Sequence, residues 1–136
     1  MQSIAQIAFL VREYDEAIEF FVQKLGFTLL QDVDMGSGKR WVVVQPQDSS
    51  GAALLLASAS TPEQIACIGN QSAGRVFLFL HTDNFQRDHT PMIARGVLFL
   101  ESPRTKSYGT VAVFEDLYGN KWDLLEPIPH TEVGRS

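Results

Sequence analysis

The sequence predicts an α+β domain built from two copies of one βαβββ unit. Three observations support this: an internal repeat, a change of hydrophobic period inside each copy, and a length of 136 residues that fits one domain. The apolar segment 7–11 recurs at 76–80, and each copy leads to a glycine, Gly26 or Gly96, so the offset is 69 residues at first and then 70. A repeat of this length matches half of a small domain. Two related halves usually leave a cleft between them.

The first half has the pattern of a strand, a helix and three strands. Residues 3–11 are apolar and rich in branched or aromatic side chains, as in a strand covered on both faces. From Asp15 the apolar residues follow helical spacing, and Gly26 suits the end of that helix. Three more strands are expected, separated by a glycine turn and a polar turn, at 27–33, 40–45 and 52–57. We place module one at about 3–60.

A linker helix and a second module follow. Thr61-Pro62-Glu63-Gln64 resembles a capping box with proline at the first helical position, which predicts a linker helix over about 61–70. Module two, about 74–127, repeats the order, with a helix from Asp83, a loop at 102–108 and strands at 75–80, 97–101, 110–115 and 122–126. Pro91 predicts a kink in that helix or a restart at Thr90. Together these parts form a single domain over 3–127, and we expect a mobile tail at 128–136.

Composition limits the classes of partner. The net charge is −5, and the 11 Lys and Arg are scattered without a basic run, which argues against nucleic acid. The sequence has no signal peptide and no apolar run of about 18 residues, so we expect no membrane association and a cytoplasmic location. The single Cys67 cannot close an intramolecular disulfide, and its neighbours Ile65 and Ile68 suggest that it is a small buried group.

Two motifs resemble the glyoxalase, bleomycin-resistance and dioxygenase superfamily, also called the vicinal oxygen chelate fold. They are 11–21 (VREYDEAIEFF) with 24–27 (KLGF), and 114–123 (FEDLYGNKWD), and the resemblance covers roughly 3–127. It implies two βαβββ modules that pair into a curved mixed sheet around a central cavity, often completed by a second subunit. A homodimer is therefore expected. Family enzymes hold a divalent metal in this cavity, with ligands from the first and last strands of each module.

The ligand positions that the resemblance implies do not suit a metal in this chain. They fall on Gln6 and Arg75 for the first strands, and on Leu54 and Asp123 for the last strands. Leucine offers no donor atom, and arginine brings a permanent positive charge without a lone pair. We therefore expect no metal and no other cofactor, with a divalent metal ion as the alternative.

The same residues suggest an ion pair in place of the metal. If Arg75 and Asp123 face the cavity, they would form a charge-assisted pair beside Gln6. In a functional version, a partly freed Arg75 binds the carboxylate, phosphonate or carbonyl of a ligand. In a structural version, the pair only orders the interior. Both versions stay open.

The predicted loop 102–109 is a second candidate binding segment, because it carries Arg104, Lys106 and Tyr108 at the expected cavity mouth. The alternative is a solvated hairpin with Tyr108 packed on its own strand. The histidines occupy none of the ligand positions, so structural or surface roles are expected for His81, His89 and His130.

Function divides into three hypotheses. The first is a cavity that binds a small anionic or carbonyl-bearing molecule, either for drug sequestration or for proton chemistry by Arg75, Asp123 and Tyr108. Pairing with Arg75 would lower the pKa of Asp123 and weaken it as a base. The second is a divalent-metal-dependent lyase or isomerase, or an extradiol-type dioxygenase. The third is a protein-interaction module.

The strand residues Trp41 and Trp122 are expected in the core, with a cavity-facing Trp41 as the alternative.

Overall fold

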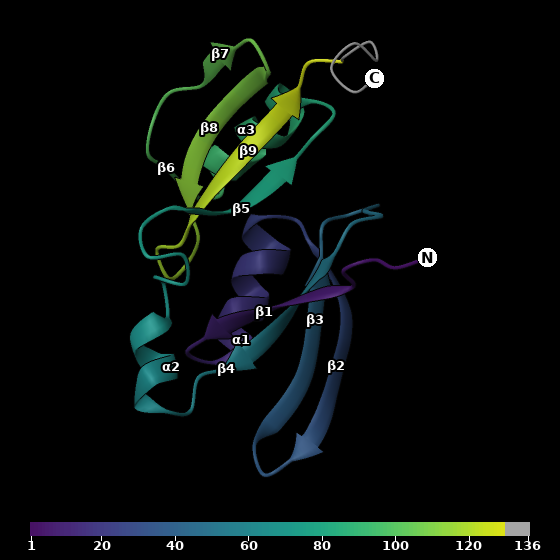
Figure 1. Cartoon of the computed structure of the whole chain (residues 1–136), viewed down its shortest axis with the longest axis vertical. Coiled ribbons are helices and arrows are strands. Elements are labelled where there is room, and N and C mark those ends of the chain that lie inside the picture. The colour runs from purple at the N-terminus through teal and green to yellow at the C-terminus, as the bar shows by residue number, and fades with distance from the viewer. Residues whose placement is uncertain (130–136) are drawn as a thin grey trace.

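In the computed structural model, which describes residues 1–129, two βαβββ modules lie end to end (Figure 1). The first module consists of β1 (Gln6–Val11), α1 (Tyr14–Glu19) with its π-helical continuation η1 (Phe20–Lys24), β2 (Thr28–Gly36), β3 (Lys39–Gln45) and β4 (Ala53–Ser58). The helix α2 (Pro62–Cys67) connects the modules. The second module consists of β5 (Val76–His81), α3 (Phe85–Ala94), β6 (Leu98–Phe99), β7 (Arg104–Lys106), β8 (Gly109–Glu115) and β9 (Lys121–Pro127).

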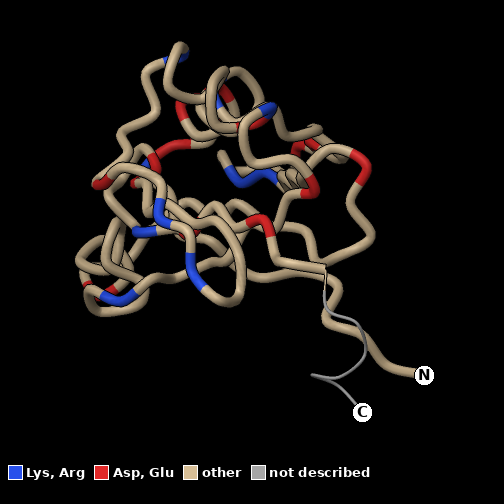
Figure 2. Tube along the Cα trace, turned by 90° about the horizontal axis from the view of Figure 1, so that it is seen from above, with Lys and Arg blue, Asp and Glu red and all other residues tan. Residues whose placement is uncertain are grey.

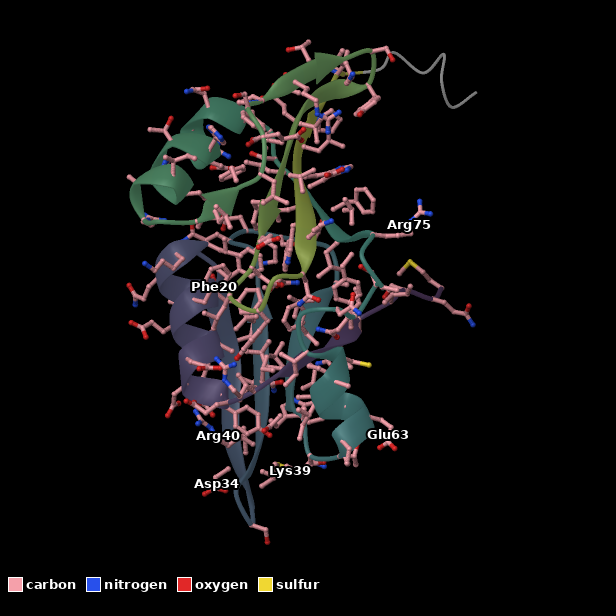
Figure 3. All side chains as sticks on the ribbon, turned by 90° about the vertical axis from the view of Figure 1, so that its left-hand side faces the viewer. Phe20, Asp34, Lys39, Arg40, Glu63 and Arg75 are labelled. Carbon is pink, nitrogen blue, oxygen red and sulfur yellow. The ribbon has the colours of Figure 1, made fainter. Side chains whose placement is uncertain are left out.

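The two modules share one sheet topology, which confirms the predicted repeat. The first sheet has the order β1-β4-β3-β2, and the second has β5-β9-β8-β6 with β7 also paired to β8. In each module the first strand runs parallel to the last one, and the other pairs are antiparallel. The helices α1 and α3 lie on the same side of the molecule, at the left in Figure 3. Each sheet therefore has a face that packs on a helix and a face that α1 and α3 leave open.

An aromatic core joins the modules. The ring centroid of Trp122 on β9 lies 6.3 Å from that of Phe9 on β1, 6.0 Å from Phe21 and 6.1 Å from Phe27. Trp122 and Phe9 are almost fully buried, so the expected core position of Trp122 is confirmed. Because these rings come from both halves of the chain, burying them stabilises the two modules as one unit.

The turn between β8 and β9 is organised by a buried carboxylate. The Asp116 carboxylate accepts from the backbone amides of Tyr118 and Asn120, from Asn120 Nδ2 and, at 2.9 Å, from Trp122 Nε1. Asn120 in turn accepts from the backbone amide of Gln71 at 3.1 Å. Asp116, Asn120 and Trp122 of the 114–123 motif therefore have a structural role, because a buried carboxylate must be satisfied by hydrogen-bond donors.

Several local predictions need correction. Pro91 lies inside α3, which continues unbroken from Phe85 to Ala94, so the helix does not restart at Thr90. The predicted loop 102–108 contains the short strand β7. Cys67 is exposed, because the short helix α2 has no buried residue. The N-cap of the predicted capping box is confirmed, since Thr61 Oγ1 accepts from the Gln64 amide at 3.1 Å, but Gln64 Oε1 accepts from the Ser60 amide at 2.9 Å and not from that of Thr61.

The remaining predictions on the tail concern residues 130–136, including His130, and lie outside the described part of the chain. Within residues 1–129, every helix is too short to cross a membrane. Figure 2 shows acidic and basic residues interspersed along the coloured trace, without a continuous basic stripe over these residues.

Candidate functional site

The open face of the second sheet carries a carboxyl group that the core does not use. On β9 the side chains alternate, so Trp122 and Leu124 are buried in the core and Asp123 faces the opposite side. Asp123 pairs with Val113 on β8 and with Phe79 on β5, and directly paired residues of adjacent strands share a face. Asp123 therefore lies at the centre of the open face, between an aliphatic and an aromatic neighbour.

Arg104, on the adjacent edge of this face, is held by a carboxylate. Its Nε and Nη2 atoms donate to the two carboxylate oxygens of Glu101 at 2.8 and 2.9 Å. Glu101 Oε2 also accepts from the Val113 backbone amide at 2.9 Å. The guanidinium group lowers the pKa of Glu101, and the Val113 amide adds to this effect. Both charges of the pair are thus matched within the protein.

Asp123 itself lacks such a partner. Its Oδ1 atom is buried and has no hydrogen-bond partner among the described residues. Burial raises the pKa of Asp123, the nearby Arg104 charge opposes this shift, and Glu101 reinforces it. An acceptor that is shielded from water and unpaired costs stability.

Two large apolar side chains are exposed on the same face as Asp123. Phe79 is 61% exposed even though it lies directly beside Asp123 in the sheet. Leu98 is also exposed and faces the same side through its pairing with Glu115. A separate cavity of about 630 Å³ lies at the edge strand β5, between the 46–52 turn and core-side residues such as Leu78 and Trp122, and Asp123 is not among its lining residues.

Arg75 does not reach Asp123, so the predicted ion pair between them is wrong. Arg75 is exposed just before β5 and its side chain points outward (Figure 3), and no ion pair joins it to Asp123 within residues 1–129. A β-bulge follows Val76, which pairs with Lys121, and Phe79 is opposite Asp123. Arg75 thus lies about three residues, or roughly 10 Å, along the strand from the level of Asp123.

The counterpart of Asp123 in the first module is also different from the predicted one. Leu54 is only 5% exposed and faces the core beside Ile7. Its neighbour Leu55 pairs with Val43 in the way that Asp123 pairs with Val113. The offset of 69 residues therefore fails at the last strand, where one residue of slip moves a side chain to the other face.

The remaining predicted residues are separate from this cluster. Gln6 is exposed at the start of β1 in the other module. Tyr108 lies in the β7–β8 turn, half-exposed, near enough to Arg104 to add to the raised pKa of that guanidinium, for which Glu101 is the main cause. Trp41 is partly exposed, and its Nε1 donates to Gln31 Oε1 at 2.9 Å on the open face of the first sheet. The expected core position of Trp41 is therefore wrong.

Two members of the site escaped the sequence reasoning. In the sequence Phe79 is one of several apolar strand residues, and the bulge after Val76 that helps to set its face leaves no signal there. Glu101 does have a signal, since it stands three residues before Arg104, at a spacing suited to a local ion pair.

The family metal site does not fit the residues present. In the described chain there is no group of three or more His, Cys, Asp and Glu side chains that could hold a metal ion. Of the four positions implied by the resemblance, Leu54 is in the core, Arg75 points away and Gln6 lies on a different sheet from Asp123. A single carboxylate without neighbouring donors is a poor site for a divalent ion.

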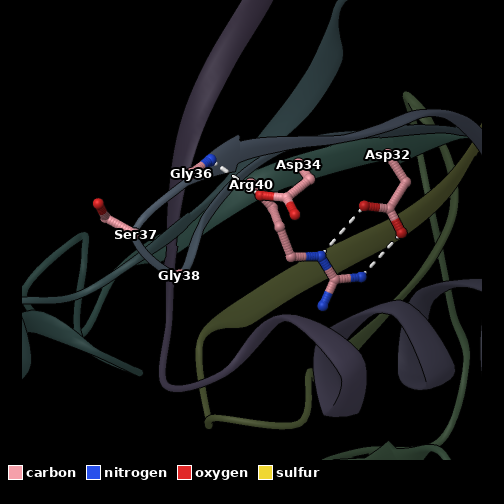
Figure 4. A pocket seen from close by; sticks show the side chains of 6 residues that line it. All are labelled: Asp32, Asp34, Gly36, Ser37, Gly38 and Arg40. Atoms are coloured by element: carbon pink, nitrogen blue, oxygen red, sulfur yellow. Dashed lines mark hydrogen bonds and ion pairs between the residues drawn. The ribbon is translucent and has the colours of Figure 1, made fainter.

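A second hollow, at the β2–β3 turn, is a structural feature. Arg40 donates from Nε and Nη2 to Asp32 at 3.1 and 2.8 Å (Figure 4). Its Nη1 atom lies 2.9 Å from Asp15 Oδ1, and its guanidinium stands over the Tyr14 ring at 5.1 Å. Arg40 thereby connects the hairpin to α1. All three of its side-chain nitrogens bond to Asp32 or Asp15, so the hollow is a consequence of this ion-pair network.

The comparisons with known proteins agree with the fold. The family described as the Glyoxalase/Bleomycin resistance protein/Dioxygenase superfamily matches residues 3–124. An uncharacterized protein of Shewanella frigidimarina (strain NCIMB 400) is 58% identical over 126 residues, covering 92% of this chain and 93% of that protein. The crystal structure of UcmS2 has 25% identity and a TM-score of 0.79, with 93% and 98% of the two chains covered. TnmS3, an antibiotic binding protein from Streptomyces sp. CB03234, has 27% identity and a TM-score of 0.74, with 94% and 98% covered.

Proposed function

Because the chain belongs to the glyoxalase/bleomycin resistance protein/dioxygenase superfamily, we propose that it is a metal-free protein that binds and sequesters a small molecule on the open face of the second sheet. The observation that carries this proposal is the carboxyl group of Asp123, which has no hydrogen-bond partner at Oδ1 among the described residues, on a face that also exposes Phe79 and Leu98. A polar group of this kind can orient a ligand, while the exposed apolar side chains supply affinity. The similarity to TnmS3, described as an antibiotic binding protein, supports a binding role.

A homodimer is part of the proposal. The open faces of both sheets expose apolar side chains, among them Val33 and Trp41 on the first and Phe79 and Leu98 on the second. Exposed apolar faces of this kind mark interaction sites. A second copy of the chain would cover them and close the binding face from above.

Catalysis without a metal is the second candidate. The burial that raises the pKa of Asp123 moves this carboxyl towards the range that suits a general base. The predicted objection, that Arg75 would lower this pKa, no longer applies because the two residues are apart. In that case Asp123 would abstract a proton from a bound carbonyl compound, as the general base of a lyase or isomerase does.

Thermal unfolding with a panel of flat aromatic antibiotics and small carbonyl compounds tests the binding proposal. A ligand at 100 times its Kd should stabilise the protein by about 2.7 kcal/mol. Phe79→Ala should abolish this shift, whereas Ile65→Ala, at an equally exposed apolar position on α2, should leave it unchanged. Stoichiometric metal in the purified protein, or equal ligand shifts in both variants, would contradict the proposal. Turnover of a bound carbonyl compound that Asp123→Asn abolishes would favour the catalytic candidate.

A further inference from the structure

We propose that the cavity between the 46–52 turn and β5 is a second binding site, which takes a flat, neutral molecule with a cyclic amide at its edge. This site goes beyond the proposed binding face, because Asp123 does not line it. The backbone of an edge strand recognises the amide, and side chains of both modules enclose the flat body. The proposal depends on the free edge of β5 and on the walls and size of the cavity.

The free edge of β5 faces the cavity. Four consecutive residues of this strand, 78–81, line it. Successive side chains of a strand point to opposite faces, so the part of the strand that all four residues share is its backbone edge. Among the described strands β5 pairs with β9 alone, which leaves this edge without a neighbouring strand. The backbone edge therefore forms one wall of the cavity.

Two residues present unpaired backbone groups at this edge. The Thr82 amide donates to the Leu125 carbonyl at 2.9 Å, and alternate residues of a parallel strand bond to the same neighbour. Leu80 therefore also bonds to β9, and the N–H and C=O groups of Phe79 and His81 point to the free edge. No loop or side chain within residues 1–129 bonds to these groups. Both residues are exposed, so their backbone groups are open to a ligand.

A cyclic amide matches this edge. The Phe79 carbonyl and the His81 amide are neighbouring groups along it, one an acceptor and the other a donor. A cyclic amide carries its own N–H and C=O side by side in one plane, so it donates to Phe79 and accepts from His81 in the manner of an added strand. A longer extended peptide fits less well, because the bulge between Val76 and Leu78 interrupts the edge.

The walls of the cavity suit a flat, uncharged body. Its core side is formed by apolar side chains of both modules, Ile7, Phe27, Leu54 and Trp122. Its volume of about 630 Å³ falls in the range of small-molecule sites. Its described lining residues include no lysine or arginine, so an anion finds no partner there. A charge placed against the apolar side would also lose its hydration without compensation.

NMR and calorimetric titration with 2-quinolone, a neutral cyclic amide on an aromatic body, tests the proposal. N-methyl-2-quinolone is the control probe, because it has the same body without the N–H. We expect 2-quinolone to bind at least about tenfold more tightly, since the control leaves a backbone acceptor unpaired. It should shift the amide resonances of residues 79–81 and of the 46–52 turn. Ala52→Leu, which fills the cavity, should weaken its binding at least tenfold, whereas Ala66→Leu, the same change on the exposed helix α2, should leave it unchanged.

The backbone donor is tested by two substitutions at one residue. Proline is tolerated where the N–H of an edge strand points away from the sheet. His81→Pro, which removes this N–H, should weaken 2-quinolone binding by about tenfold, and His81→Ala, which keeps it, by less than about threefold. If His81→Pro does not fold, the shift of the His81 amide on titration of the wild type decides the point.

The outcomes distinguish this site from the open face. Equal binding of the two probes, unchanged binding by Ala52→Leu, or an unshifted His81 amide would overturn the proposal. Amide shifts confined to Glu101, Val113 and Asp123 would also overturn it, and would leave the proposed function standing. If neither probe binds the wild type, the second site falls, while the open face is still judged by its own ligand panel. Phe79 borders both places, so a ligand lost in Phe79→Ala but kept in Ala52→Leu belongs to the open face.

Discussion

Replacing Asp123 by asparagine should make the protein more stable at neutral pH. The side chain keeps its shape, but the ionised carboxylate that burial disfavours is removed. A buried acceptor without a partner costs about 1–3 kcal/mol. Asp123 is only partly buried and the new amide must itself reach water, so we take the lower end, about 1 kcal/mol. For a domain of this size that corresponds to roughly 4 °C in Tm.

The pH dependence follows from the sign of the pKa shift. The pKa of Asp123 is higher in the folded than in the unfolded protein, so its ionisation lowers the free energy of unfolding. This loss is absent below the ordinary aspartate pKa of about 3.9 and complete once the pH has risen through the raised value. The gain from Asp123→Asn should therefore be full at pH 7 and shrink towards zero near pH 3.5.

Urea denaturation of both proteins at several pH values measures this difference directly, with Glu115→Gln as the control for a lost charge on the same face. A variant less stable than the wild type at pH 7 would refute the reasoning, because Oδ1 would then have a partner that the geometry does not show. A gain that stays constant with pH would refute the assignment to ionisation.

Three other changes test separate parts of the structure. Glu101→Gln should cost about 1 kcal/mol at pH 7 by weakening the Arg104 pair, and because the pKa of Glu101 is lowered, the deficit should vanish in urea titrations as the pH falls below about 4. Asp116→Ala should cost about 2–4 kcal/mol in chemical denaturation, because Trp122 Nε1 and three other donors lose their acceptor. Trp41→Glu should convert the expected homodimer to a monomer in light scattering, and a monomeric wild type would contradict that prediction.

The fold was predictable because its signals are local and repeated. The helical spacing from Asp15, the positive φ of +78° at Gly26 and the capping box at Thr61 each act within one turn of chain. The helix and its closing glycine recur in the second half, where Gly96 has a φ of +89°, so the repeat supports these two assignments twice. The π-helical segment η1 and the short β7 were missed because backbone hydrogen-bond spacing and edge pairing depend on the packed neighbours.

The site was predictable only in part, because strand register decides it. Asp123 and Arg104 are both predicted, but the predicted partner of Asp123, Arg75, depends on a constant offset between the modules. A bulge after Val76 and a slip at Leu54 each break that offset. In a strand, a shift of one residue reverses the face of every side chain, so a sequence repeat accurate to one residue still cannot pair side chains across a sheet.

The two carboxylates near the end of the chain show how the fold separates stability from binding. Asp116 is more deeply buried than Asp123, and its carboxylate accepts four hydrogen bonds from the turn and from β9. Asp123, three residues after the turn's last residue Asn120, keeps an oxygen without a partner among the described residues, although Arg104 lies near enough to influence its pKa. The Val113 amide accounts for this difference, because it holds Glu101 in the place from which Glu101 engages Arg104. The backbone of β8 thus holds the arginine on Glu101, and no donor of the described chain reaches Oδ1 of Asp123.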